Sequence, residues 1–498
     1  MPASSSLQSV EIAIVGAGFA GLAMAVALRE QGANIGIGAQ DVVVLEREPD
    51  VGGTWLVNRY PGCACDVPSH LYSYSFAPNP RWSRVYASQP EILAYIRDVA
   101  ERAGVRPMVR TGCAVTSIHW QGDLGRWHVR CEDGSGYSAR FVVGATGGLS
   151  RPAFPALPGL GDFAGPTMHS ALWDESVPLD GKRVAIIGTG ASAIQLVPQL
   201  AQRVGHLDVY QRTPPWILPR MDGPLAQASQ RAMEAIPLLG WLRREALRWR
   251  SDLRSVAFVR LPGLLRLMQF LGERHLHRAV ADPALRAAVT PRYAMGCKRI
   301  LVADDYYPAL QQPHVALHVG GATAIRPDGV VDASGQVHPA DVLVLATGFS
   351  ATRPLPEGVL FDRDGQDVAK AWGDCPQAYR GTLVKGCPNF FMLVGPNTGL
   401  GHSSMLIMIE AQVRYVMALL RRTRAASDSQ IEVRAEAQDR YNDWVQAKLA
   451  KTIWATGCTS WYLSADGRNP TLWPGSTWAF ERLMARPAWD DLRLTHGR

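Results

Sequence analysis

Two glycine-rich turns, each between an apolar stretch and a helix-forming stretch, constrain the fold of this chain more than any other feature. In a βαβ unit, the first glycine of such a turn allows a tight bend, the second lets the backbone approach a pyrophosphate, and the third lets helix and strand pack closely. The sequence therefore predicts an α/β fold with two dinucleotide-binding, Rossmann-like domains. The first turn contains Gly16, Gly18 and Gly21, and the second contains Gly188 and Gly190, with Ala193 in the third place.

The residue at the end of the second strand in each unit indicates which nucleotide binds there. Glu46 ends the apolar stretch 41–46, where a carboxylate can bind ribose hydroxyls. Arg212 ends the stretch 207–212, and an arginine can pair with a 2′-phosphate that an acidic residue would repel. We therefore expect FAD at the first unit and NADPH at the second. Two such sites imply hydride transfer from a nicotinamide to a flavin, which leaves reductases, disulfide oxidoreductases and monooxygenases open.

The domain organisation follows from the length and from a repeated turn. A chain of 498 residues exceeds what one hydrophobic core usually serves. Residues 141–148 and 341–349 each combine an apolar strand with an Ala-Thr-Gly turn, and a proline-rich connection follows the first of them. We expect the NADPH domain to be inserted into the FAD domain. The predicted order is FAD domain 1–150, NADPH domain 151–222, helical insertion 223–290, NADPH domain 291–340 and FAD domain with the C-terminal region 341–498.

The helical insertion is predicted from composition. Residues 223–290 are rich in Leu, Ala and Arg and lack the alternation of strands. A helical cap packed on the enzyme is the favoured interpretation. The many arginines among apolar residues from Trp241 to Arg278 leave contact with a membrane surface as an alternative.

The charge, the absence of a recognisable targeting signal and the cysteine spacing limit the expected partners and location of the protein. The formal net charge of +7 comes from scattered basic residues and is weak evidence for nucleic acid binding. The N-terminus lacks the pattern of a secretory signal, and no uncharged apolar run reaches the ~18 residues needed to span a bilayer. We expect a cytoplasmic protein with no stable membrane insertion. The spacing of the eight cysteines fits no zinc site, so we expect no metal, and we expect Cys63 and Cys65 to be free thiols. A large chain without a secretory signal also suggests a reducing compartment.

Three segments resemble one enzyme family. FAGPTMHSALWD (163–174) resembles the signature F-x-G-x-x-x-H-x-x-x-W-(P/D) of type I Baeyer–Villiger monooxygenases. GGTWLVNRYPGCACD (52–66) is similar to the flavin-proximal loop of that family, and GCKRILVADDYY (296–307) to the segment that bears its catalytic arginine. Related flavin-containing monooxygenases, which oxidise nitrogen and sulfur, carry a similar signature without its last two positions. The signature residues here are Phe163, Gly165, His169, Trp173 and Asp174.

The resemblance implies both a reaction and residue roles. NADPH would reduce FAD, and O2 would then give a C4a-peroxyflavin that inserts one oxygen next to a ketone carbonyl, forming an ester or lactone. The resemblance places the catalytic arginine at Arg299. This guanidinium would stay charged beside the reacting oxygen, and Asp66 would hold it. Lys298 would contact the NADPH phosphate and Trp461 the nicotinamide nucleotide, although core packing is the alternative for Trp461. The signature residues would couple the domains and gate the reaction.

Other expectations concern the cofactors and the substrate. His402 is expected to line the pocket or to form a structural hydrogen bond, and a catalytic role is the alternative. Oxidation of an amine or sulfide is the alternative reaction, and an oxidase that only releases peroxide is another. The class of ketone and the oligomeric state, monomer or dimer, stay open. Further cofactor contacts are expected at Thr54, Trp55, Asp66, Tyr72, Val115, Met405, Thr189, Gly190, Ser192, Ala193, Gln195 and Thr213.

Overall fold

The first of two large sheets is built from both ends of the chain, and it is parallel except for the antiparallel pairings of β5 with β4 and β6. The computed structural model describes residues 7–259, 261, 263–425, 429–458 and 460–496. The sheet has the order β17-β4-β5-β6-β1-β2-β3, with β18 also beside β6. Its strands are β1 (Gln8–Val15), β2 (Val42–Leu45), β3 (Val109–Arg110), β4 (Val115–Gln121), β5 (Arg126–Cys131), β6 (Gly136–Gly144), β17 (Leu360–Phe361) and β18 (Phe390–Met392).

The second sheet lies in the middle of the chain and is parallel throughout. Its order is β12-β9-β8-β16-β7. The strands are β7 (Thr167–His169), β8 (Arg183–Ile187), β9 (His206–Gln211), β12 (Val315–Val319) and β16 (Val342–Leu345). We expected the second domain to end at residue 340, and this boundary is wrong. β16 pairs with both β7 and β8, so its apolar run completes the second sheet before the chain returns.

Both sheets have interior strands that are buried on both faces. Strand β2 is buried at all four positions and β16 likewise, as expected for parallel strands that are covered on both sides. The smaller sheets are antiparallel except for one pair. They consist of β13 (Ala322–Arg326), β14 (Gly329–Asp332) and β15 (Val337–Pro339), of β19 (Ser429–Val433) with β20 (Leu492–His496), and of the parallel pair β10 (Ile217–Leu218) and β11 (Leu301–Val302).

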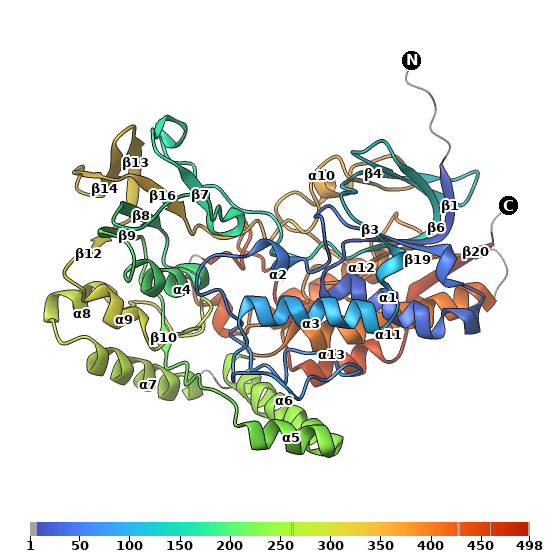
Figure 1. Ribbon diagram of the computed structural model, residues 1–498. Helices are drawn as coiled ribbons and strands as arrows, with labels where there is room; N and C mark the ends of the chain where they lie inside the picture. The colour runs from blue at the N-terminus through green and yellow to red at the C-terminus, as the bar shows by residue number, and fades with distance from the viewer. Residues whose placement is uncertain (1–6, 260, 262, 426–428, 459, 497–498) are drawn as a thin grey trace.

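Helices from distant parts of the chain gather beside the first sheet (Figure 1). Helix α1 packs against α11, and α11 packs against α13. The helices of this group are α1 (Phe19–Gln31), α2 (Thr54–Val57), α3 (Gln89–Arg102), α10 (Val368–Trp372), α11 (Met405–Ala425), α12 (Ala435–Leu449) and α13 (Thr477–Met484). Beside the second sheet lie α4 (Ala191–Leu200) and α9 (Tyr306–Leu310).

The described residues of the predicted insertion form four helices. They are α5 (Gln227–Ala235), α6 (Pro237–Val259), α7 (Gly263–Ala279) and α8 (Pro283–Val289). In Figure 1, α5, α6 and α7 run along the lower edge of the molecule, away from both large sheets. Across the part of the chain that the structure describes, no helix combines the length and apolarity needed to cross a bilayer.

Candidate functional site

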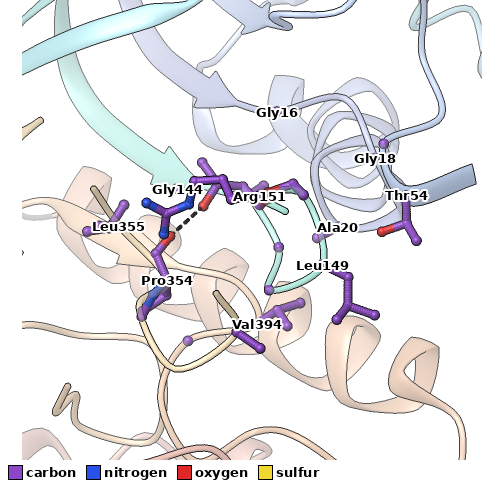
Figure 2. Close-up of a pocket in the computed structure, with 18 of the residues that line it drawn as sticks. Gly16, Gly18, Ala20, Thr54, Gly144, Leu149, Arg151, Pro354, Leu355 and Val394 are labelled. Carbon is purple, nitrogen blue, oxygen red and sulfur yellow. Dashed lines mark hydrogen bonds between the residues drawn. The ribbon is translucent and has the colours of Figure 1, made fainter. Parts of the chain in front are cut away.

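A cavity of about 380 Å³ opens at the carboxyl ends of β1, β2 and β6. Figure 2 shows part of its wall, to which Gly16, Gly18 and Thr54 contribute from the first unit and Leu149 and Val394 from other segments. Parallel sheets bind ligands at this end of their strands. Ten of the residues predicted from the sequence line the cavity: Gly16, Gly18, Glu46, Thr54, Trp55, Tyr72, Val115, Arg299, Met405 and Trp461.

The first glycine turn leaves no room for side chains. Gly16 has φ +106°, and a Cβ there would lie 2.6 Å from the carbonyl oxygen of Ala145. A Cβ at Gly21 would lie 1.8 Å from the carbonyl oxygen of Gly16. Gly18 caps α1 with no side-chain hydrogen bond, so the first N–H groups of the helix are available to an anion. The turn therefore forms a cradle of backbone donors.

Glu46 is buried at the end of β2 and is held in one orientation. Its Oε2 accepts a hydrogen bond from the Ala17 N–H at 2.6 Å, and its Oε1 accepts one from the Glu48 N–H at 2.9 Å. Burial raises the pKa of this carboxyl, although the two N–H donors oppose that shift. Each oxygen keeps a second lone pair, so the carboxyl can also accept hydrogen bonds from ligand hydroxyls.

Arg299 and Asp66, 233 residues apart in the sequence, form an ion pair at the cavity. Asp66 Oδ2 accepts from Nη2 of Arg299 at 2.5 Å and from its Nε at 3.1 Å. Burial alone would raise the pKa of Asp66, but the guanidinium outweighs it and the pKa is lowered. Asp66 in turn raises the pKa of Arg299. Because 34% of the arginine side chain remains exposed, the guanidinium is held by Asp66 and still reaches the cavity.

The position of Arg299 depends on a short parallel pairing. β11 begins two residues after Arg299 and pairs with β10, so that Leu301 lies beside Ile217.

An aromatic pair also lines the cavity. Trp55 Nε1 donates to the Tyr72 hydroxyl at 3.1 Å. Burial raises the pKa of Tyr72 well above its usual range, so this hydroxyl stays neutral.

The second unit repeats the first turn with a more open geometry. Gly188 has φ +116° and Gly190 caps α4, but a Cβ at Gly190 would meet nothing within 4 Å. The Thr189 hydroxyl donates to the Thr213 carbonyl at 3.2 Å. Ala193 is buried in the third place. Ser192, in the first turn of α4, is partly buried beside it.

Gln195 makes a contact between the two units that the sequence did not predict. Its amide oxygen accepts from the Tyr60 hydroxyl at 2.9 Å, and its amide nitrogen donates to the Ala64 carbonyl at 3.0 Å. Tyr60 and Ala64 belong to the loop before Asp66. The side chain therefore joins α4 of the second unit to the loop that holds the ion pair, and a cofactor contact at Gln195 stays a prediction.

Two cations lie close together at the end of β9. Lys298 has a lowered pKa, because it is partly buried and because Arg212 repels its charge. The ammonium of Lys298 also lies 5.0 Å from the ring centre of Tyr293. Such paired cations suit a phosphate dianion.

The signature residues lie at the edge of the second sheet and do not line the cavity. His169 ends β7 beside β16 and is buried, and its ring lies 6.1 Å from that of Phe349. Its Nδ1 accepts from the Ala171 N–H at 3.1 Å. Phe163 and Trp173 are buried, whereas Asp174 is exposed. Gly165 has no room for a side chain, because a Cβ there would lie 2.3 Å from the Asp341 carbonyl oxygen.

The cysteines behave partly as expected. Cys63 and Cys65 are free thiols, as predicted, and both are buried. Our expectation of a reducing compartment did not anticipate that Cys297 and Cys458 form a disulfide, with Cα atoms 6.3 Å apart. The 161 residues between them hide this pair from spacing arguments. The bond ties the segment of Lys298 and Arg299 to the loop that precedes Trp461.

His402 does not line the cavity. It is buried, and within the described chain neither ring nitrogen has a hydrogen-bond partner. Burial lowers its pKa to about 4, so the ring is neutral at pH 7. Neither role expected from the sequence is therefore seen for this residue.

Two groups in the described chain have the composition of a metal site, and one of them consists of Cys113, Cys131 and Asp133. In the other, Asp208, His318 and His338 place one ligand atom each within 4.8 Å of one another. His318 Nε2 is 2.7 Å from Asp208 Oδ1, and His338 Nε2 is 2.9 Å from Asp332 Oδ2. These hydrogen bonds account for the cluster without an ion.

Sequence reasoning missed one wall of the cavity. Residues 144–151 and 351–356 contribute most of it, and the Thr146 hydroxyl donates to the Pro354 carbonyl at 3.2 Å. The first of these segments follows β6 directly. The Ala-Thr-Gly turn after that strand was the available signal, since ligands lie at strand ends in such sheets.

Comparison with known proteins gives a consistent result. A family model described as pyridine nucleotide-disulphide oxidoreductase matches residues 13–222. A Baeyer-Villiger monooxygenase of Pseudomonas aeruginosa is 44% identical over 97% of this chain and 91% of its own length. One of Streptomyces coelicolor is 44% identical over 96% and 91%.

Solved structures match over nearly the whole chain. A closed cyclohexanone monooxygenase matches with a TM-score of 0.86 and 28% identity, covering 99% of this chain and 100% of the other. A steroid monooxygenase bound to NADP matches with a TM-score of 0.85 and 29% identity, covering 98% and 100%.

Proposed function

This chain belongs to the Baeyer–Villiger monooxygenase family, FAD-dependent enzymes that use NADPH and O2, and from that premise we propose which of its residues carry the oxygenation of a ketone. The substrate is a small ketone and the product an ester or lactone. The relatives favour this reaction over the oxidation of amines or sulfides.

The cavity fits the flavin nucleotide. The pyrophosphate is assigned to the turn of Gly16 and Gly18, where side chains are absent and N–H groups are free. The ribose is assigned to Glu46, whose carboxyl is fixed by two backbone donors. Thr54, Trp55, Tyr72, Val115 and Met405 would line the remaining length.

The second unit fits NADPH. Gly190 and the first turn of α4 would receive its pyrophosphate, because nothing occupies the space above Gly190. Arg212 and Lys298 would bind the 2′-phosphate, which would relieve the mutual repulsion seen in the lowered pKa of Lys298. Trp461, which lines the cavity and is 45% exposed, would contact the nicotinamide end.

When bound, FAD and NADPH supply the electrons and activate O2. Arg299 supplies a permanent positive charge and a rigid set of N–H donors at the cavity wall. These donors would stabilise negative charge as it develops on the oxygen of the ketone carbonyl. Asp66 acts through Arg299 as a positioning residue, because it holds the guanidinium by two hydrogen bonds.

The observation that carries this proposal is the Arg299–Asp66 pair at the wall of the cavity. Replacing Arg299 by Ala should lower ester formation by about 10²–10³-fold, while FAD stays bound and NADPH still reduces it. Replacing it by Lys keeps the charge without the planar donor set, and should recover only part of the rate.

The measurement is product analysis with 18O2, NADPH and a panel of cyclic, linear and aromatic ketones plus one thioether. An ester or lactone carrying one 18O from the wild type, and little from Arg299→Ala, is expected. Undiminished ester formation by Arg299→Ala would remove this residue from the mechanism. Sulfoxide as the sole product of the wild type would contradict ketone oxygenation.

A further inference from the structure

Helix α6 buries several polar residues and exposes a stripe of large apolar ones, while its last turn also buries Ala257 and Phe258. A helix on the surface of a globular protein normally buries its apolar stripe. Here the buried side carries Arg244, Ser251, Asp252 and Ser255. The opposite side exposes large apolar residues spaced four or seven positions apart: Leu238, Leu242, Trp249 and Leu253, with Trp241 beside them.

The buried polar residues of α6 have specific partners, so this orientation of the helix is held firmly. Arg244 donates to the carbonyl oxygen of Ser73 at 2.6 Å. Asp252 accepts from the backbone N–H of Thr477 at 3.0 Å and from its hydroxyl at 2.8 Å, at the start of α13. Rotating the helix to hide its apolar stripe would break these contacts and leave buried charges unpaired.

Helix α7 repeats the pattern. Leu264, Leu267 and Leu271 lie on one face at i, i+3 and i+7, and they are 50%, 63% and 49% exposed. The same face continues to Arg274 and Arg278 near the end of the helix. Both helices lie on the lower edge of the molecule in Figure 1, where neither large sheet covers them. Contiguous apolar exposure of this kind marks an interaction site.

The charge of this segment indicates what it binds. Residues 237–279 contain nine arginines and three acidic residues, a surplus of +6 in a chain whose formal net charge is +7. Among the described residues, Arg250, Arg266, Arg274 and Arg278 have no acidic side chain within 4.0 Å. Each acidic residue already has a partner within the protein. Asp252 accepts from Thr477 in the first turn of α13, Glu245 pairs with Arg248, and Glu273 accepts from Gln269.

We propose that the exposed face of α6 and α7 docks on an anionic lipid surface. Tryptophan and leucine side chains would enter the boundary between headgroups and acyl chains, and the arginines would contact the lipid phosphates. A second copy of this chain is a poorer partner, because a two-fold contact would bring the same excess of arginines together. The docking is peripheral, with α6, about 34 Å long, lying along the membrane plane.

The proposal is tested by co-sedimentation of the FAD-loaded enzyme with vesicles of phosphatidylcholine alone or mixed with phosphatidylglycerol. We expect binding to the mixed vesicles, little to the neutral ones, and release on raising the salt concentration. The combined variant Arg250→Gln and Arg274→Gln should weaken partitioning by about fivefold for each arginine removed. The matched control replaces Arg29 and Arg130, which are exposed on α1 and β5, by Gln and should bind like the wild type.

The apolar contribution is tested by Leu242→Ser, Trp249→Ser and Leu253→Ser in one protein, with Leu124→Ser, 61% exposed between β4 and β5, as control. The triple variant should lose vesicle binding and keep its bound FAD, its thermal stability and its activity in vesicle-free buffer. Equal binding to neutral and anionic vesicles would overturn the anionic assignment. Failure of the wild type to bind any vesicle, or a dimer that the triple variant converts to a monomer, would overturn the lipid assignment.

Discussion

The two dinucleotide-binding units share a backbone but differ at two places, and each difference matches a different nucleotide. Both turns open with a glycine at positive φ, +106° at Gly16 and +116° at Gly188. In the first unit, β2 is followed by Glu46, which is buried and hydrogen-bonded to the backbone. In the second unit, β9 is followed by Arg212, which lies close to Lys298. The same fold therefore presents a carboxylate at one site and two cations at the other, which is the basis of the ribose and phosphate contacts proposed above.

The third position of each turn shows how closely helix and strand approach. A Cβ at Gly21 would lie 1.8 Å from a backbone oxygen, whereas Ala193 carries its Cβ in the equivalent place without difficulty. The first unit is thus packed more tightly than the second. The experiments below test this contrast and the contacts that join the two units, from the largest expected effect to the smallest.

Gly21→Ala should have the largest effect, because the clash is with backbone that cannot move aside. We expect the variant to release FAD, and we expect its free energy of unfolding to fall by about 3 kcal/mol or more. Ala193→Gly is the matched change in the second unit and should cost only about 0.5–1 kcal/mol. Thermal unfolding and the ratio of FAD to protein measure both variants. Retention of FAD by Gly21→Ala would mean that the two units are packed alike.

Cys458→Ser tests the covalent connection between the second unit's cationic segment and the C-terminal loop. Removing a disulfide that closes a long loop typically costs about 2–4 kcal/mol, and the expected result is a lower unfolding temperature. A raised KM for NADPH is also expected, because Lys298 follows Cys297 directly. Wild-type protein treated with a reductant is the control and should match the variant. Unchanged stability in both would show that the bond constrains little.

Arg212→Ala tests the electrostatic side of the comparison. Loss of a charge-assisted phosphate contact should raise the KM for NADPH by about 10–100-fold and leave the KM for NADH nearly unchanged. Steady-state oxidation of the two cofactors gives both values. Arg212→Glu should go further and favour NADH, since it makes the second unit resemble the first. Equal effects on both cofactors would reject the phosphate assignment.

Asp66→Asn should have the smallest effect on stability, and one that depends on pH. The folded pKa of Asp66 lies below its unfolded value of about 3.9, so its contribution is present above that value and is lost as pH falls through the folded pKa. The variant should therefore be less stable than the wild type at pH 7, and the difference should shrink as the pH falls below about 3.9. Denaturant unfolding at pH 7 and at a series of pH values below 4 measures this. A difference that stays constant throughout would mean that Asp66 does not titrate as an ion-paired group.

Much of the site follows from local sequence because its backbone requirements are local. The turn at Gly16 and Gly18, the strand ends at Glu46 and Arg212, and the helical character of residues 223–290 all depend on residues close in the chain. Arg299 and Asp66 were identified by resemblance to a family, and the sequence carries no physical signal that pairs them. Their contact requires the β10–β11 pairing to bring residue 299 beside the loop at residue 66.

The sequence by itself determined that this chain has two nucleotide-binding units and which charge each presents, because glycine φ preferences and side-chain chemistry act within a few residues. Only the tertiary structure decided where β16 belongs, that Cys297 meets Cys458, that Gln195 joins the two units, and that α6 turns its apolar stripe outward. Each of these depends on segments far apart in the chain. Their pairing is set by how sheets and helices pack together, which no local pattern encodes.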